Sequence, residues 1–133
     1  MTATVLTTPA SIRRPLMRTG VVAGLAAAIA TPVVAFGGHA AGISLDIAGE
    51  PIPLYAFAQL TFIGALLGVG LAALCRRAAS PRTRFLQVSA ALVAVSFVPD
   101  AVVDAAVSTK LLLMATHMVA AAIVIPALAR RIA

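Results

Sequence analysis

Four long apolar stretches take up most of this chain of 133 residues and constrain its fold more than any other feature. Each is close to the ~20 residues that a helix needs to cross the ~30 Å hydrocarbon core of a bilayer. With only 11% charged residues, the chain lies far from a typical soluble domain, of which about 25% is charged. The sequence therefore predicts a membrane protein. The stretches run from Leu16 to Gly38, from Pro53 to Cys75, from Phe85 to Asp104 and from Thr109 to Ala129.

The stretches are expected to be helices rather than strands. Inside hydrocarbon every backbone N–H and C=O group needs a partner within the protein, and a helix supplies these partners within one segment. The strands of a membrane barrel would instead show ~10 residues of alternating polarity, and the stretches lack that alternation. We predict an all-α protein, an integral membrane four-helix bundle over residues 15–133, preceded by a disordered cytoplasmic tail at residues 1–14.

Basic residues flank the stretches unevenly. The connection after the first stretch carries Asp46 and Glu50. Lys110, at the connection after the third stretch, is the single basic residue of these two flanks. Segments rich in Lys and Arg stay on the cytoplasmic side, so both termini are predicted to be cytoplasmic and the membrane to be the plasma (inner) membrane. The nine basic residues of the opposite flanks are Arg13, Arg14, Arg18, Arg76, Arg77, Arg82, Arg84, Arg130 and Arg131.

The net charge of +6 has a membrane explanation. The same basic flanks are attracted to anionic lipid headgroups, so the lipid bilayer is the expected partner. Nucleic-acid binding would need a soluble basic domain, which the sequence does not contain. We therefore expect no nucleic-acid partner.

Glycines with a spacing of four mark two helix faces that favour close packing. Gly20 with Gly24 lies in the first stretch, and Gly64 with Gly68 lies in the second. Small residues at this spacing let helix backbones approach each other in membranes. The depths of Gly24 and Gly68 are similar, which predicts that the two faces meet in one crossing within the molecule. Alternatively, one face drives a homo-oligomer.

A polar layer is predicted in the outer half of the bundle. The third and fourth stretches are joined by a short turn, which places Asp100 and His117 ~10–13 Å from the outer surface and within reach of each other. Pro99 precedes Asp100 and removes one backbone donor of the helix, next to Ser96. The other residues expected at this depth are Thr31, Gln59 and Thr116.

Two interpretations of this layer remain open. In the functional one, Asp100 and His117 handle protons or bind a ligand from outside, because histidine titrates near neutrality and an ionised carboxylate in lipid needs a partner or a wet cavity. In the structural one, the same side chains join helices through hydrogen bonds that average ~0.6 kcal/mol in membranes. The candidate site residues under either interpretation are Asp100, His117, Thr31, Gln59, Ser96 and Thr116.

Motifs for catalysis, metals and cofactors are absent from the sequence. It has no glycine-rich phosphate loop and no serine within a Gly-x-Ser-x-Gly motif. Cys75 is the single cysteine, and the two histidines lack the ligand spacing of structural zinc sites. We therefore expect no enzymatic activity, no metal and no cofactor.

Several of these features resemble those of small uncharacterised actinobacterial membrane proteins with four transmembrane helices, which form a domain family of unknown function. The resemblance rests on the Ala-rich composition and on three segments: residues 96–100, residues 109–117 with the Met114-x-x-His117 pattern, and residues 126–130. It covers the chain from Leu16 onward and implies a plasma-membrane location without an assigned activity. Small multidrug exporters are similar in size, but they carry a membrane-embedded Glu in the first helix, which this chain lacks.

The expected function follows from these observations. We expect a small multi-pass plasma-membrane protein that acts as an accessory or interaction component, with a homo-oligomer or a larger membrane protein as its partner. The alternative is a small proton-coupled transporter or sensor that uses the Asp100–His117 pair.

Overall fold

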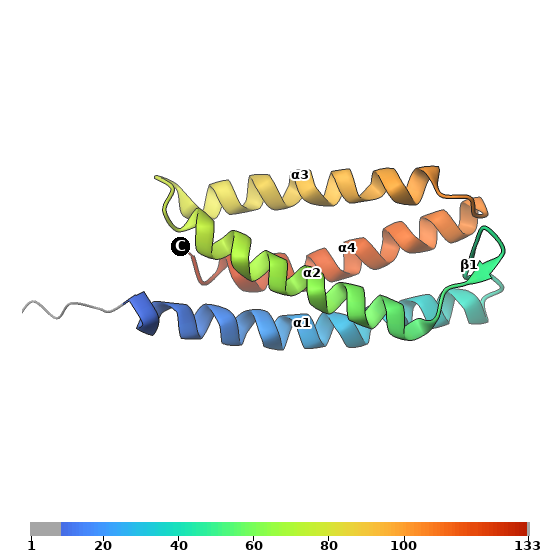
Figure 1. Ribbon diagram of the computed structural model, residues 1–133, viewed down its shortest axis with the longest axis horizontal. Coiled ribbons are helices and arrows are strands. Elements are labelled where there is room, and N and C mark those ends of the chain that lie inside the picture. Colours follow the sequence, from blue (N-terminus) through green and yellow to red (C-terminus); the bar gives the residue numbers. More distant parts are fainter. Residues whose placement is uncertain (1–8, 133) are drawn as a thin grey trace, which may run out of the picture.

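The computed structural model of the protein describes residues 9–132, which form a bundle of helices. A hairpin of two short strands, β1 (Asp46–Ile47) and β2 (Glu50–Pro51), connects the first two helices. Figure 1 shows the helices side by side, with the hairpin at one end and the C-terminus near the α2–α3 connection at the other. The helices in this range are α1 (Pro9–Ala40), α2 (Leu54–Cys75), α3 (Pro81–Val102) and α4 (Val107–Ala129).

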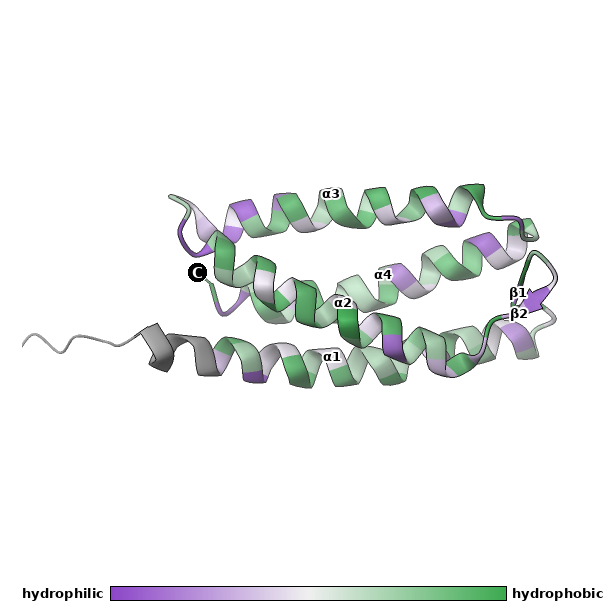
Figure 2. Cartoon of the chain, viewed as in Figure 1, coloured by the Kyte–Doolittle hydropathy of each residue, from purple (hydrophilic) through white to green (hydrophobic). Residues whose placement is uncertain are grey.

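All four helices of the described range are long and apolar enough to cross a membrane. Figure 2 shows apolar residues along the length of each helix, whereas hydrophilic residues gather mainly in the connections and near the helix ends. Apart from the short hairpin, the prediction of an all-helical chain with four such helices is confirmed.

The helix bounds differ from the predicted stretches mainly in α1 and α3. α3 begins at Pro81, because proline suits the first turn of a helix, where its missing N–H has no intrahelical partner. It ends at Val102, so Asp104 lies in the connection to α4. α1 begins at Pro9, within the segment predicted as a tail, and residues 1–8 of that tail lie outside the described residues.

Glycine allows α1 to pack closely on α2. A Cβ atom at Gly24 would lie only 2.9 Å from the Cβ of Ala65, and one at Gly20 would clash with the Val69 side chain. Ala65 and Val69 directly follow Gly64 and Gly68 in the sequence, so α2 is turned by about 100° from the predicted contact between two glycine faces. The face with Gly20 and Gly24 therefore packs on α2, whereas Gly64 and Gly68 are not part of the α1–α2 contact.

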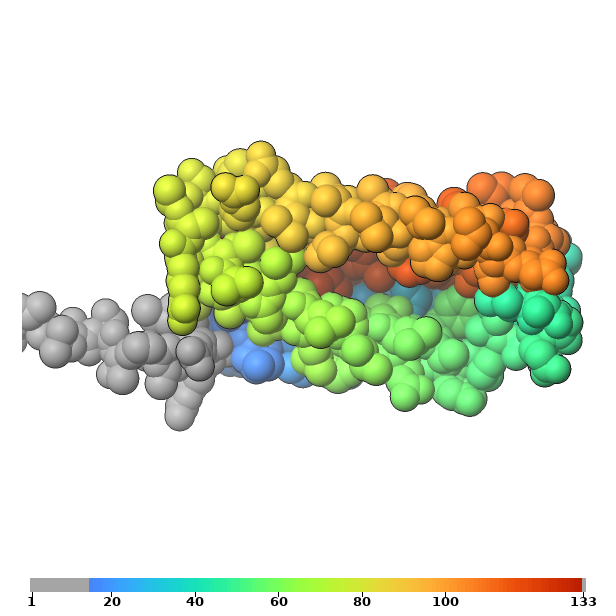
Figure 3. Space-filling model, turned by 45° about the horizontal axis from the view of Figure 1, so that its top comes forward, coloured from blue at the N-terminus to red at the C-terminus, as the bar shows by residue number. Residues whose placement is uncertain are grey.

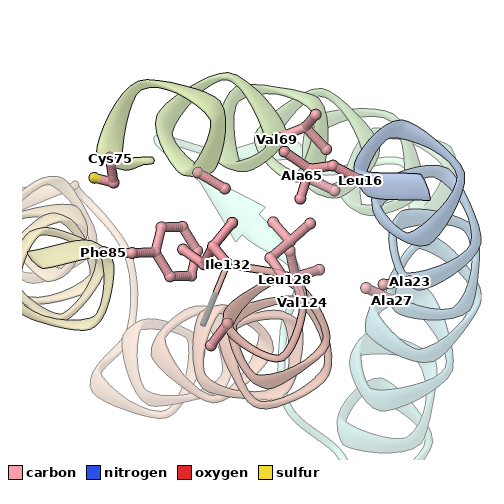
Figure 4. Close-up of a cluster of buried hydrophobic side chains, with 12 residues drawn as sticks. Leu16, Ala23, Ala27, Ala65, Val69, Cys75, Phe85, Val124, Leu128 and Ile132 are labelled. Atoms are coloured by element: carbon pink, nitrogen blue, oxygen red, sulfur yellow. The ribbon is translucent and has the colours of Figure 1, made fainter. Parts of the chain in front are cut away.

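Two apolar clusters hold the bundle together. The larger one joins all four helices towards the end that carries the C-terminus, and in Figure 4 Phe85 of α3 points to Ile132 while Val124 and Leu128 of α4 face α2. The smaller cluster lies at the hairpin end and includes Phe57. α1 packs extensively on α2 and α4, whereas α3 packs mainly on α4 and less on α2. α3 therefore stands apart from α2.

Hydrogen bonds tie the hairpin to the α3–α4 connection. The Ala48 N–H donates to the Asp104 carbonyl at 2.7 Å, and the Thr109 hydroxyl donates to the Ser44 carbonyl at 2.6 Å. Ala48 and Gly49 form the turn between β1 and β2 with φ values of 53° and 82°. Positive φ at both central residues characterises a type I′ turn, which suits a two-residue hairpin.

Candidate functional site

The separation of α3 from α2 leaves a groove of about 610 Å³, which we call the α2–α3 groove. α2 and α3 form its walls and α4 contributes its floor. Figure 3 shows the hollow between α2 (green) and α3 (yellow to orange), with atoms of α4 visible at its base. The lining is mainly apolar and includes Leu67, Leu92 and Val124, while its polar side chains are Thr61, Ser89, Ser96, Asp100, Thr116 and His117.

Asp100 and His117 meet in this groove. The Nδ1 atom of His117 lies 2.8 Å from Oδ2 of Asp100, and 44% of the histidine side chain is exposed against 11% of the aspartate side chain. The same Nδ1 lies 3.2 Å from the Leu113 carbonyl, and the ring geometry directs an N–H on this atom at that carbonyl. Oδ2 is consequently close to the imidazole but has no directed hydrogen bond from any described residue.

The hydroxyl groups beside this pair already donate to their own helices. Ser96 donates to the Val93 carbonyl at 2.7 Å, and Thr116 donates to the Leu113 carbonyl at 2.7 Å. Each hydroxyl has one hydrogen to donate, so what it presents to the groove is an acceptor oxygen. The polar part of the groove therefore offers hydrogen-bond acceptors.

Thr31 and Gln59 do not join the Asp100–His117 pair. Thr31 is buried between α1 and α2, where its hydroxyl lies 3.0 Å from that of Thr61 and 3.4 Å from the Phe57 carbonyl. Gln59 is exposed and is not part of the groove lining. The predicted single layer is therefore divided into a Thr31–Thr61 contact and a groove cluster of Ser96, Asp100, Thr116 and His117.

Thr61 lines the groove although the sequence reasoning did not single it out. It lies one helical turn beyond Phe57, on the side of α2 that also carries Gly64 and Gly68 in the lining. A helix-face projection from Gly64 would have found it. The glycine spacing therefore identifies the face of α2 that lines the groove, and not the face that packs on α1.

Gly64 leaves space in the wall of the groove. A Cβ atom at this position would meet no described heavy atom within 4 Å, whereas one at Gly68 would lie 3.3 Å from Leu128. Gly64 therefore widens the groove, whereas Gly68 packs against α4.

A second hollow, of about 980 Å³, lies between α1 and α4 and is lined in part by Arg18 and Arg131. Its lining includes no carboxylate or histidine. Within residues 9–132, no group of three His, Cys, Asp or Glu side chains could hold a metal ion. The α2–α3 groove is therefore the stronger candidate site.

Comparison with known protein families gives one match. A family of unknown function, DUF6069, matches residues 11–133. The chain belongs to DUF6069. The prediction of an uncharacterised family is thereby confirmed, while actinobacterial origin stays a prediction. The comparisons of this DUF6069 protein with curated proteins and with solved structures returned no match. Family membership and the apolar helices together indicate a small multi-pass membrane protein.

Proposed function

We propose that this protein is an accessory component of the plasma (inner) membrane that binds another membrane component in the α2–α3 groove. The observation that carries the proposal is the sideways opening of the groove. In a bundle that spans a bilayer, an opening between two helices faces lipid rather than water. An apolar hollow with a few polar groups at fixed positions is also the usual form of a small-molecule site, for which volumes of about 300–1,000 Å³ are typical.

The proposed role is binding rather than catalysis. The polar groups of the groove are one carboxylate, one imidazole and four hydroxyls, of which those of Ser96 and Thr116 donate to their own helices. Such groups orient a bound molecule through hydrogen bonds and charge. The proposed orientation places the arginine-rich end of the bundle in the cytoplasm and the β1–β2 hairpin outside, in line with the positive-inside rule.

Photo-crosslinking in native membranes tests the proposal. A photoreactive amino acid replaces either Leu67, which is 71% exposed and lines the groove, or Ile29, which is 68% exposed and lies on α1. We expect a discrete adduct from position 67 that position 29 does not give. Equal, diffuse lipid labelling from both positions would contradict a binding groove.

A steric block identifies adducts that depend on the groove itself. Gly64→Leu is expected to fill the groove and abolish the discrete adduct from position 67. The matched control is Gly70→Leu, because neither glycine would bring a Cβ within 4 Å of any described heavy atom and Gly70 is not part of the lining. Loss of the adduct in both variants, or in neither, would count against the proposal.

A further inference from the structure

The α2–α3 groove is elongated along the helices. On α2 its lining extends from Ala56 to Leu71, a length of about 22 Å at ~1.5 Å per residue. A volume of 610 Å³ over this length leaves room for an extended hydrocarbon chain that lies parallel to the helices.

One end of the groove is polar and the other is apolar. Asp100 lies near the C-terminal end of α3, which finishes at Val102, while Phe85 lines the groove near the beginning of the same helix. The distance along α3 between these two residues is about 22 Å. A linear molecule in the groove can thus place a polar head beside Asp100 and extend its tail towards Phe85 and Leu128.

The carboxylate at the polar end lies against one imidazole but receives no directed hydrogen bond. Asp100 is 8% exposed, and its Oδ2 lies 2.8 Å from Nδ1 of His117 without a directed hydrogen bond from the described residues. The hydroxyls of Ser96 and Thr116 donate elsewhere, so their oxygens are acceptors as well. A molecule bound here must therefore bring N–H or O–H donors of its own.

Charge narrows the choice of head group further. α2 contains no charged residue, α4 contributes Lys110 and His117, and α3 contributes Asp100 together with Arg82 and Arg84 at its opposite end. The Lys110 ammonium donates to the Ala101 carbonyl at 2.9 Å. An ionised carboxylate at membrane depth is costly, and a cation on the ligand adds a charged partner for Asp100 next to His117.

We propose that the α2–α3 groove binds a single-chain amphiphile with an amine head group, taken up from the bilayer. The ammonium group pairs with Asp100 beside His117, and the hydrocarbon tail extends along the groove to Phe85. This inference rests on the proposed function and names the chemistry of the molecule that the groove holds.

Tryptophan fluorescence gives a direct test because the chain contains no tryptophan of its own. Leu67→Trp places a single indole at the rim of the groove, and Ile29→Trp places one on α1 as the control. Each full-length variant is reconstituted in phosphatidylcholine vesicles and titrated with hexadecylamine that carries a nitroxide on its chain. We expect saturable quenching in Leu67→Trp and only weak, linear quenching in Ile29→Trp. Equal quenching of the two variants would overturn the proposal.

Competition then tests the head group. Unlabelled hexadecylamine is expected to reverse the quenching, hexadecanol to do so at least tenfold more weakly, and hexadecanoic acid not at all. In the Leu67→Trp background, Asp100→Asn should weaken amine binding at least tenfold, whereas Asp104→Asn, an exposed residue of the connection, should leave it unchanged. Circular dichroism melting confirms that both variants are folded.

The two proposals fail in different ways. Equal competition by the acid and the amine, or full amine binding by folded Asp100→Asn, would refute the amine assignment. If Gly64→Leu still abolished the photo-crosslinked adduct, the binding function would stand with a different occupant. If Gly64→Leu left the adduct unchanged, both proposals would be refuted.

Discussion

At the scale of single residues, Asp100 stands out because its placement is unfavourable for stability. Its carboxylate is nearly buried, and Nδ1 of His117 lies between it and a backbone carbonyl, 2.8 Å from Asp100 Oδ2 and 3.2 Å from the Leu113 oxygen. A carboxylate that only joined helices would be expected to receive hydrogen bonds from both sides of the contact. Groups that bind ligands, by contrast, often reduce the stability of the empty protein.

Asp100→Asn separates these two roles by the sign of its effect. The change removes the charge and keeps the shape, so for a ligand site we expect the free energy of unfolding to rise by about 1–2 kcal/mol, below the ~2.5–3.5 kcal/mol cost of a charge at the bilayer centre. For a structural link it would fall by about 0.6 kcal/mol. Reversible unfolding in detergent micelles measures the difference. Asp104→Asn, exposed to solvent, should stay within about 0.5 kcal/mol of the natural protein.

The sequence was a good guide to the pair but not to the whole layer. Asp100 and His117 could be matched in depth because a short turn fixes how their helices fold back on each other. Thr31 and Gln59 have similar depths, but depth does not determine on which side of a helix a residue lies. Thr31 faces α2 and Gln59 faces outward, and only the rotation of each helix in the packed bundle decides this.

At the scale of helices and their connections, Gly24 and Gly64, one glycine of each pair, have opposite environments. Gly24 of α1 faces the Cβ of Ala65, which has no rotamer that would move it away. Gly64 of α2 faces open space in the groove, within the described residues. The same spacing in the sequence therefore serves close packing in one helix and a hollow in the other.

The substitution of each glycine by alanine tests this contrast. Gly24→Ala should force α1 and α2 apart and lower the free energy of unfolding by about 1–3 kcal/mol, the usual cost of overpacking. Gly64→Ala should leave it unchanged or raise it by up to about 1 kcal/mol, because alanine favours the helix. Thermal melting of the two variants in the same detergent gives the comparison. A larger loss in Gly64→Ala would show that α2 is rotated differently.

The β1–β2 turn contains an alanine in a conformation that disfavours it. Ala48 has a φ of 53°, whereas type I′ turns prefer Asn followed by Gly. Ala48→Asn is expected to raise the free energy of unfolding by about 0.5–1 kcal/mol, since the left-handed region costs most L-residues about 1–2 kcal/mol. Ala79→Asn, exposed in the α2–α3 connection, is the control. An equal shift in both melting temperatures would argue against the turn.

At the scale of the whole molecule, the four helices of the described range differ in how closely they pack on one another. α1 packs closely on both α2 and α4, and α3 is attached to the bundle mainly through α4. The number of helices and their approximate bounds could be predicted, because apolar length alone determines them. The groove could not be predicted, because it depends on how far α3 stands from α2, and no local pattern in either helix specifies that distance.

The distribution of charge between the two ends of the bundle leads to the last prediction, which concerns its orientation. The α2–α3 connection holds arginines, and Arg76 donates to the Arg131 carbonyl at 3.1 Å at this end, whereas the hairpin holds Asp46 and Glu50. The arginine end is expected to be retained in the cytoplasm during insertion. Two variants in a Cys75→Ser background report the two ends, namely Glu50→Cys in the hairpin and Ala79→Cys in the connection, both at exposed positions.

An impermeant maleimide applied to intact cells should label Glu50→Cys and should reach Ala79→Cys only after permeabilisation. The reverse pattern would invert the bundle, and the polar end of the groove would then lie near the cytoplasm. Labelling of both positions in intact cells would place the two ends of α2 on the same side, which a membrane-spanning helix does not allow. In that case the groove would open to water rather than to lipid, and an occupant taken up from the bilayer would lose its route of entry.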